Sequence, residues 1–87
     1  SLLPINAAQA SYGWKYIGTF SRGPVSAKVD SYAREYVNLQ VAIPNKRSFP
    51  VTIDCLRYRY TIQSNGRGWE AIDSGSLGGL LVNNFCS

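Results

Sequence analysis

One stretch of the chain, residues 36–43 (YVNLQVAI), alternates strictly between two kinds of side chain. The aliphatic set is Val37, Leu39, Val41 and Ile43, and the set between them is Tyr36, Asn38, Gln40 and Ala42. Successive side chains of a β-strand point to opposite faces, so this period of two predicts a strand with one buried apolar face.

Four further segments are predicted to be strands, because they are rich in β-branched and aromatic residues and are bounded by turn residues. They are residues 13–19, 25–30, 49–53 and 56–63, with residues 31–35 as a connector and 44–47 as a loop. The apolar parity changes between Ile53 and Tyr58, which predicts a β-bulge near Cys55 and Leu56 or a sheet covered on both faces.

The dipeptide Asn65-Gly66 predicts a type I′ hairpin turn, because both of its residues tolerate positive φ angles. The resulting register pairs Ile62 with Trp69, Thr61 with Glu70 and Tyr60 with Ala71.

The last segment changes to a helical period. Ser76 can cap a helix in which Leu77, Leu80, Leu81 and Phe85 share one face, and Cys86 closes it. Gly78 and Gly79 each weaken such a helix by roughly 1 kcal/mol relative to alanine, so another interaction must hold it in place.

These elements predict an α+β fold: a single antiparallel sheet of about five to six strands with one C-terminal helix. The chain has 87 residues, of which 45% are hydrophobic and 16% charged, so it is expected to form one globular domain.

The start of the chain is typical of an export signal. Ala8-Gln9-Ala10 fits the small-residue cleavage site of a secretory signal peptide. We therefore interpret residues 1–10 as the remnant of such a signal and residues 11–87 as the domain. The other interpretation is an N-terminal arm or first strand.

Cys55 and Cys86 are the two cysteines of the chain. In a small exported domain they are expected to pair, which would tie the helix to the sheet and stabilise the fold by roughly 3.5 kcal/mol. Two free thiols in a cytosolic protein are the alternative. A metal site is not expected, because histidine is absent and there is no Cys-x-x-Cys spacing.

The chain resembles a known family over roughly residues 13–86, loosely in the first half, at Trp14, Ile17-Gly18 and Val29-Asp30, and more closely in the second. The relevant segments are Ile53-Asp54-Cys55-Leu56-Arg57-Tyr58-Arg59-Tyr60, Trp69-Glu70-Ala71-Ile72, Gly75-Ser76, Leu80-Leu81 and Cys86. They are similar to surface-adhesin protein E-like domains, small exported bacterial proteins that include cyanobacterial ones. The resemblance implies an antiparallel sheet, a C-terminal helix and a Cys55–Cys86 disulfide. The chain departs from the family at Ser74, where proline is usual, and in a shorter hairpin at residues 63–69.

Basic and aromatic residues are the candidate binding surface of a chain whose net charge is +4. They are Arg57, Arg59, Arg67, Lys46, Arg47, Trp14 and Trp69. Arg57 and Arg59 are expected on one strand face, with Tyr58 and Tyr60 on the other. This surface could contact an acidic protein or an anionic surface; the alternative is a solvated face over a tyrosine-rich core. The two tryptophans could stack on a sugar or cover the sheet. Nucleic acid is not expected as a partner.

Catalysis is not expected. Histidine, the commonest general base, is absent. Asp54 and Glu70 could form a carboxylate pair on neighbouring strands, but nearby arginines would keep both ionised. We therefore predict no enzyme activity and no cofactor.

The sequence thus predicts a non-catalytic extracytoplasmic binding module that contacts protein or a cell surface, with at most peripheral membrane contact. The alternative is an extrinsic accessory subunit that stabilises a membrane complex on the periplasmic or thylakoid-lumen side.

Overall fold

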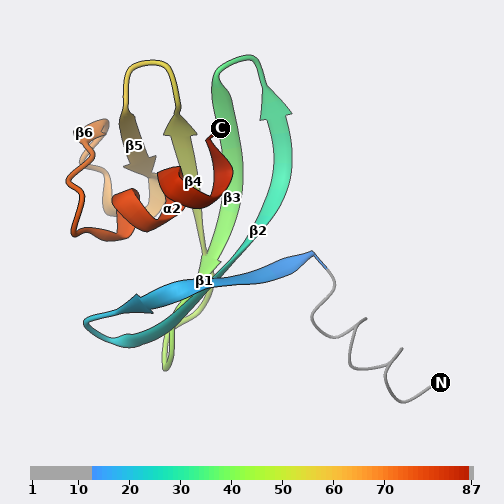
Figure 1. Ribbon diagram of the computed structural model, residues 1–87, viewed down its shortest axis with the longest axis vertical. Helices are drawn as coiled ribbons and strands as arrows, with labels where there is room; N and C mark the ends of the chain where they lie inside the picture. The colour runs from blue at the N-terminus through green and yellow to red at the C-terminus, as the bar shows by residue number, and fades with distance from the viewer. Residues whose placement is uncertain (1–12, 87) are drawn as a thin grey trace, which may run out of the picture.

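The computed structural model describes residues 13–86. Its elements are β1 (Trp14–Phe20), β2 (Gly23–Ala33), β3 (Tyr36–Ala42), β4 (Phe49–Asp54), β5 (Arg59–Ile62), the 3₁₀ helix η1 (Gln63–Asn65), β6 (Glu70–Ala71) and the helix α2 (Leu77–Phe85). The six strands form one antiparallel sheet in the order β1-β2-β3-β4-β5-β6 (Figure 1). The predicted fold class is confirmed. The proposed signal remnant, residues 1–10, lies outside the described residues.

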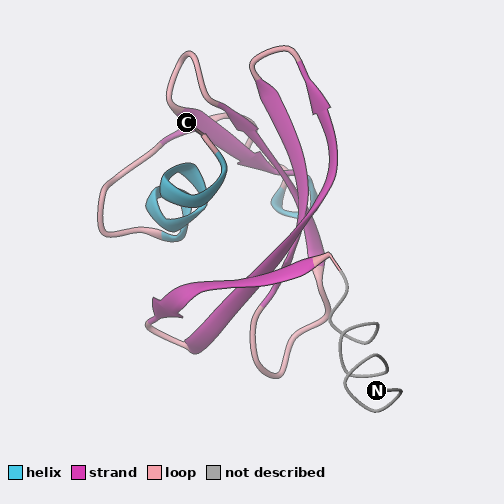
Figure 2. Ribbon diagram, turned by 45° about the vertical axis from the view of Figure 1, so that its right-hand side comes forward, coloured by secondary structure: helices cyan, strands magenta, loops and turns pink. Residues whose placement is uncertain are grey.

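The sheet is strongly twisted, and α2 lies on its concave side (Figure 2). The helix contacts β1 near one edge of the sheet and β4 near its middle. The predicted alternation in β3 is confirmed, because Val37, Leu39 and Val41 are buried toward the helix while the residues between them are only half-buried. The core is completed by Ile17, Val25, Ala27, Val51, Ile53, Leu81 and Val82.

The opposite face of the sheet is polar and connects its strands by side-chain hydrogen bonds. The Asn38 amide donates to Ser31 Oγ at 3.0 Å on β2, and its Oδ1 accepts from the Thr52 hydroxyl at 2.7 Å on β4. A sheet with one apolar and one polar face is the usual arrangement for an antiparallel sheet that is covered on one side.

β2 is longer than the sequence predicted. The segment 31–35, expected to be a connector, continues the strand as far as Ala33, and only Arg34 and Glu35 form the turn. The register shifts between Val29 and Ser31. Such a β-bulge moves the side chains that follow it to the opposite face. The alternation of apolar and polar residues therefore breaks at this point, and the sequence does not show that the strand continues.

The predicted bulge near Cys55 and Leu56 is wrong. Residues 55–58 form a turn that ends β4 and starts β5 at Arg59. Tyr58 is in this turn with a positive φ of 57° and is exposed, so it does not share an apolar strand face with Tyr60. The parity change in the sequence therefore marks a chain reversal.

The predicted hairpin register after β5 is also wrong, by one residue. Tyr60 pairs with Glu70 and Arg59 with Ala71. The chain enters η1 after Ile62, and Gly66 ends η1 in the left-handed conformation. The glycine therefore has the positive φ that its sequence suggested, but in a longer loop than a two-residue turn.

The C-terminal helix is confirmed, and the structure explains both of its glycines. Ser76 Oγ caps the helix by accepting from the Gly79 amide at 3.3 Å. A Cβ on Gly78 would lie 2.9 Å from the Tyr60 ring, and one on Gly79 would lie 2.7 Å from the Asp73 carbonyl oxygen. The helix thus approaches its neighbours more closely than alanine allows.

Candidate functional site

The Asp54 carboxylate, at the end of β4, is the centre of a polar cluster. The side chain is 0% exposed, and its Oδ1 accepts the backbone N–H groups of Leu56 at 3.1 Å and Arg57 at 3.0 Å. Its Oδ2 accepts from the guanidinium groups of Arg57 at 3.1 Å and Arg59 at 3.0 Å. Both carboxylate oxygens are therefore satisfied, as a buried charge requires.

These contacts decide the protonation state of Asp54. Burial on its own would raise the pKa of Asp54, but the Arg57 amide and the Arg57 and Arg59 guanidinium groups lower that pKa to about 2. Hydrogen bonds to the charged form favour ionisation. Asp54 is thus ionised at neutral pH.

Arg57 and Arg59 both form ion pairs with carboxylates. Arg57 also forms an ion pair with Glu35 at 3.0 Å, in the turn between β2 and β3. The Arg59 guanidinium lies 4.4 Å from the centre of the Trp69 ring, within the usual range of a cation–π contact. The predicted basic strand face does not form, because Arg57 lies in the turn 55–58 and only Arg59 is on β5. The charges of both arginines are balanced by Asp54 and Glu35.

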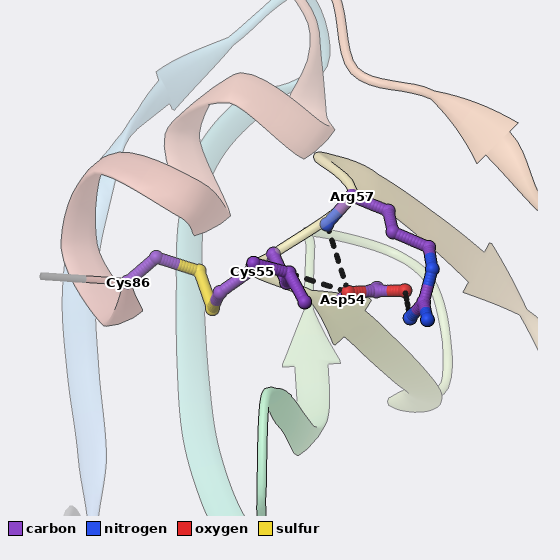
Figure 3. Close-up of a disulfide and its surroundings, with 5 residues drawn as sticks. Asp54, Cys55, Arg57 and Cys86 are labelled. Carbon is purple, nitrogen blue, oxygen red and sulfur yellow. Dashed lines mark hydrogen bonds and ion pairs between the residues drawn. A yellow bond between two sulfur atoms is a disulfide. The ribbon is translucent and has the colours of Figure 1, made fainter.

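The turn 55–58 is held in place from three directions. Asp54 binds two of its backbone amides, and the Cys55 amide donates to the Glu35 carbonyl oxygen at 2.9 Å. The Cys55–Cys86 disulfide, with a Cα–Cα distance of 5.7 Å, attaches the turn to the end of α2 (Figure 3). The predicted disulfide is present, and it indicates an oxidising environment outside the cytosol.

This fixed turn exposes large apolar side chains. Leu56 is 73% exposed and Tyr58 54% exposed, and Tyr32 on β2, at the same end of the sheet, is 68% exposed. The β2–β3 and β4–β5 turns lie side by side at this end (Figure 1). We call Tyr32, Leu56 and Tyr58 the apolar tip.

The other predicted site residues lie elsewhere. Lys46 and Arg47 are exposed in the β3–β4 loop, at the opposite end of the sheet, and Arg67 is exposed after η1. Trp14 is on β1 and Trp69 precedes β6, so the structure places them at opposite edges of the sheet and does not bring them together as one stacking surface.

The imagined carboxylate pair does not form. In the strand register, Asp54 on β4 lies opposite Arg59 on β5, and Glu70 on β6 lies opposite Tyr60 on β5. Because the consecutive residues Arg59 and Tyr60 point to opposite faces of the sheet, so do the two carboxylates. Within residues 13–86 no pocket is found and no group of acidic, histidine or cysteine side chains could hold a metal. No helix in that part of the chain is long and apolar enough to cross a membrane.

Sequence reasoning missed Glu35 and the apolar tip. The sequence places Glu35 in a connector, and the role of this residue depends on a contact with Arg57, 22 residues away. One local signal for the turn was available. Aspartate commonly accepts the amide two residues further on, so Asp54 followed by Leu56 could have indicated a turn.

Comparisons with protein-family models, curated proteins and solved structures found no match to this chain. The resemblance to surface-adhesin protein E-like domains therefore stays a prediction.

Proposed function

We propose that the protein is a non-catalytic extracytoplasmic binding module that contacts a partner protein through its apolar tip. One observation carries the proposal: the turn 55–58 is fixed by a buried carboxylate and a disulfide, yet it presents Leu56 and Tyr58 to solvent. Large apolar side chains exposed on a fixed turn are a candidate contact site.

The backbone of the turn supports this interpretation. Tyr58 adopts a φ of 57°, a conformation that costs a residue with a Cβ roughly 1–2 kcal/mol and that glycine adopts freely. A turn that only joined β4 to β5 would be more stable with glycine or asparagine there. A strained, exposed tyrosine is therefore better explained by a contact that it makes with a partner.

Rigidity adds to the value of the tip as a contact. A partner that binds a fixed loop does not lose the entropy of ordering it, and buried aromatic anchors contribute much of the energy of protein interfaces. The partner is expected to offer an apolar pocket, because Arg57 and Glu35 beside the tip already neutralise each other. Arg34, exposed in the β2–β3 turn, leaves a positive charge at its border.

The disulfide is the basis for the proposed compartment. We place the module at the cell surface, in the periplasm or, in a cyanobacterium, in the thylakoid lumen, after removal of a signal at residues 1–10. An adhesin-like contact with another protein is the leading role. The accessory-subunit alternative differs in the partner, which would then belong to a membrane complex.

Photocrosslinking tests the proposal. A photoreactive phenylalanine analogue replaces Tyr58 or, separately, Tyr32 in the oxidised protein, which is then irradiated with envelope material of the source organism. Both positions should give an adduct with the same protein. Tyr16 on β1 is the matched control, because it is 61% exposed and lies away from the tip.

Equal labelling from Tyr16, Tyr32 and Tyr58, or adducts with unrelated proteins, would contradict a specific contact at the tip. A native gel then assigns the role. An adduct that migrates with a large membrane complex identifies an accessory subunit, and one that migrates as a pair identifies an adhesin-type contact.

A further inference from the structure

The positive charge of the protein is concentrated on β1, on the first part of β2 and in the β3–β4 loop, and its outermost charges lie in loops at the end of the sheet opposite the apolar tip. The described residues 13–29 and 40–49 contain five basic residues and no acidic one. We call these five residues the basic end: Lys15, Arg22, Lys28, Lys46 and Arg47. The rest of the described chain has four basic and five acidic residues, so the basic end accounts for all of the net positive charge.

The charges of the basic end are not neutralised within the described residues. The ion pairs found among residues 13–86 join Arg57 and Arg59 to Asp54 and Glu35, next to the apolar tip, and none includes a residue of the basic end. The three lysines of the basic end lie over aromatic rings instead: Lys15 over Phe85 at 5.8 Å, Lys28 over Trp14 at 5.6 Å and Lys46 over Phe49 at 5.7 Å. A ring orients an ammonium group and leaves its charge in place.

Two loops bring the outermost of these charges together. Arg22 is in the β1–β2 turn, and Lys46 and Arg47 are in the β3–β4 loop. The loops meet where a Cβ on Gly23 would lie 3.2 Å from Pro44. Both loops project from the lower end of the molecule in Figure 2, and all three basic side chains are exposed.

We propose that the basic end binds the anionic headgroups of a lipid bilayer. Two protruding loops with exposed cations can meet a flat surface at the same time. No pocket that would select a single small anion is found in residues 13–86. Each Lys or Arg near an anionic bilayer adds attraction that falls off within a screening length, so charges at the loop ends count most.

The contact is superficial. The large apolar residues in or next to these loops, Phe20, Ile43 and Phe49, are half-buried in the fold and are not free to insert. Binding should therefore be electrostatic and reversible. It would orient the module with its apolar tip away from the bilayer, because the two features lie at opposite ends of the sheet.

Vesicle sedimentation tests this proposal with two charge-matched variants. The oxidised protein is mixed with vesicles of equal parts phosphatidylglycerol and phosphatidylcholine, or of phosphatidylcholine alone. Lys46→Gln with Arg47→Gln removes two charges from the basic end. Arg34→Gln with Arg67→Gln removes two exposed charges outside the basic end, so that both variants have the same net charge.

We expect binding only to the anionic vesicles, weakened by added salt. The Lys46/Arg47 variant should lose roughly 30-fold in partitioning, and the Arg34/Arg67 variant much less. Equal losses in both variants would mean attraction by net charge alone and would overturn the proposal. Binding to an acidic polysaccharide such as dextran sulfate but not to the vesicles would overturn it too, and would assign the basic end to a glycan.

The outcome is independent of the proposed function. A Leu56→Ser variant removes an apolar residue of the tip and should bind the anionic vesicles as the unmodified protein does. Loss of vesicle binding in that variant would contradict the separation of the two surfaces.

Discussion

Asp54 binds Arg57 twice, through the backbone amide at 3.0 Å and through the guanidinium group at 3.1 Å. One carboxylate thus fixes both the path of the turn and the position of a side chain that reaches Glu35 on another turn. Asp54 is 0% exposed, so a single buried carboxylate both accepts hydrogen bonds from backbone amides and forms ion pairs with arginines.

The stability of the protein should depend on the charge of Asp54. Its pKa in the folded state, about 2, lies below the ordinary value of 3.8. A depressed folded pKa means that the stabilisation is complete above about pH 4 and is lost as the pH falls toward 2. Urea unfolding of the wild type and of Asp54→Asn at several pH values measures this.

The wild type should have the higher free energy of unfolding near neutral pH, and the difference should shrink across that acidic window. Glu35→Gln is the control, because Glu35 forms one ion pair with Arg57 and is not fully buried. Its effect should be smaller. A difference between wild type and Asp54→Asn that stays constant with pH would contradict the role of the charge.

The disulfide should be a large part of the stability. It joins residues separated by 31 positions, and closing a loop of that length stabilises a fold by about 3.5 kcal/mol. The Cys55→Ser, Cys86→Ser double variant should lose about that amount in denaturant unfolding. Reductant should lower the stability of the wild type and leave the double variant unchanged; equal stability of the two oxidised samples would argue against the bond.

Replacing Gly79 of the helix by alanine, a change that usually stabilises a helix, should destabilise this protein. Gly79→Ala would place a Cβ 2.7 Å from the carbonyl oxygens of Asp73 and Ser74, which are backbone atoms that cannot move aside cheaply. We expect a loss of roughly 1–3 kcal/mol in the free energy of unfolding. Gly75→Ala is the matched control, since its Cβ would meet nothing within 4 Å. A stabilised Gly79→Ala protein would contradict the close approach.

The sequence predicted the elements whose pattern is local. The strict alternation of β3 identified its buried face, and Ser76 with the leucine spacing identified α2. The two cysteines indicated the bond between sheet and helix, because each cysteine has only the other as a possible partner within the chain.

The rest depended on contacts across the chain or on unusual backbone. Nothing in Tyr58 as a residue type suggests a positive φ. The bulge between Val29 and Ser31 interrupts the alternation that would have revealed the full length of β2. Arg57 and Arg59 looked like a free basic face, because only the fold brings Glu35 to Arg57 and sets Asp54 opposite Arg59.

The tip itself is the part of the proposal most open to measurement. In Leu56→Ser with Tyr58→Gly, the two exposed apolar side chains of the turn 55–58 are removed and the strained φ is relieved, while the Asp54 contacts to the backbone are retained. The free energy of unfolding should stay within about 1 kcal/mol of the wild type.

The most direct test measures the affinity of this double variant for the protein that photocrosslinks at Tyr58, with unfolding measured on the same samples. We predict that affinity falls by roughly 30-fold or more, as expected when anchor residues are truncated, while stability is kept. Unchanged affinity in the folded variant would contradict the assignment of the apolar tip as the contact surface.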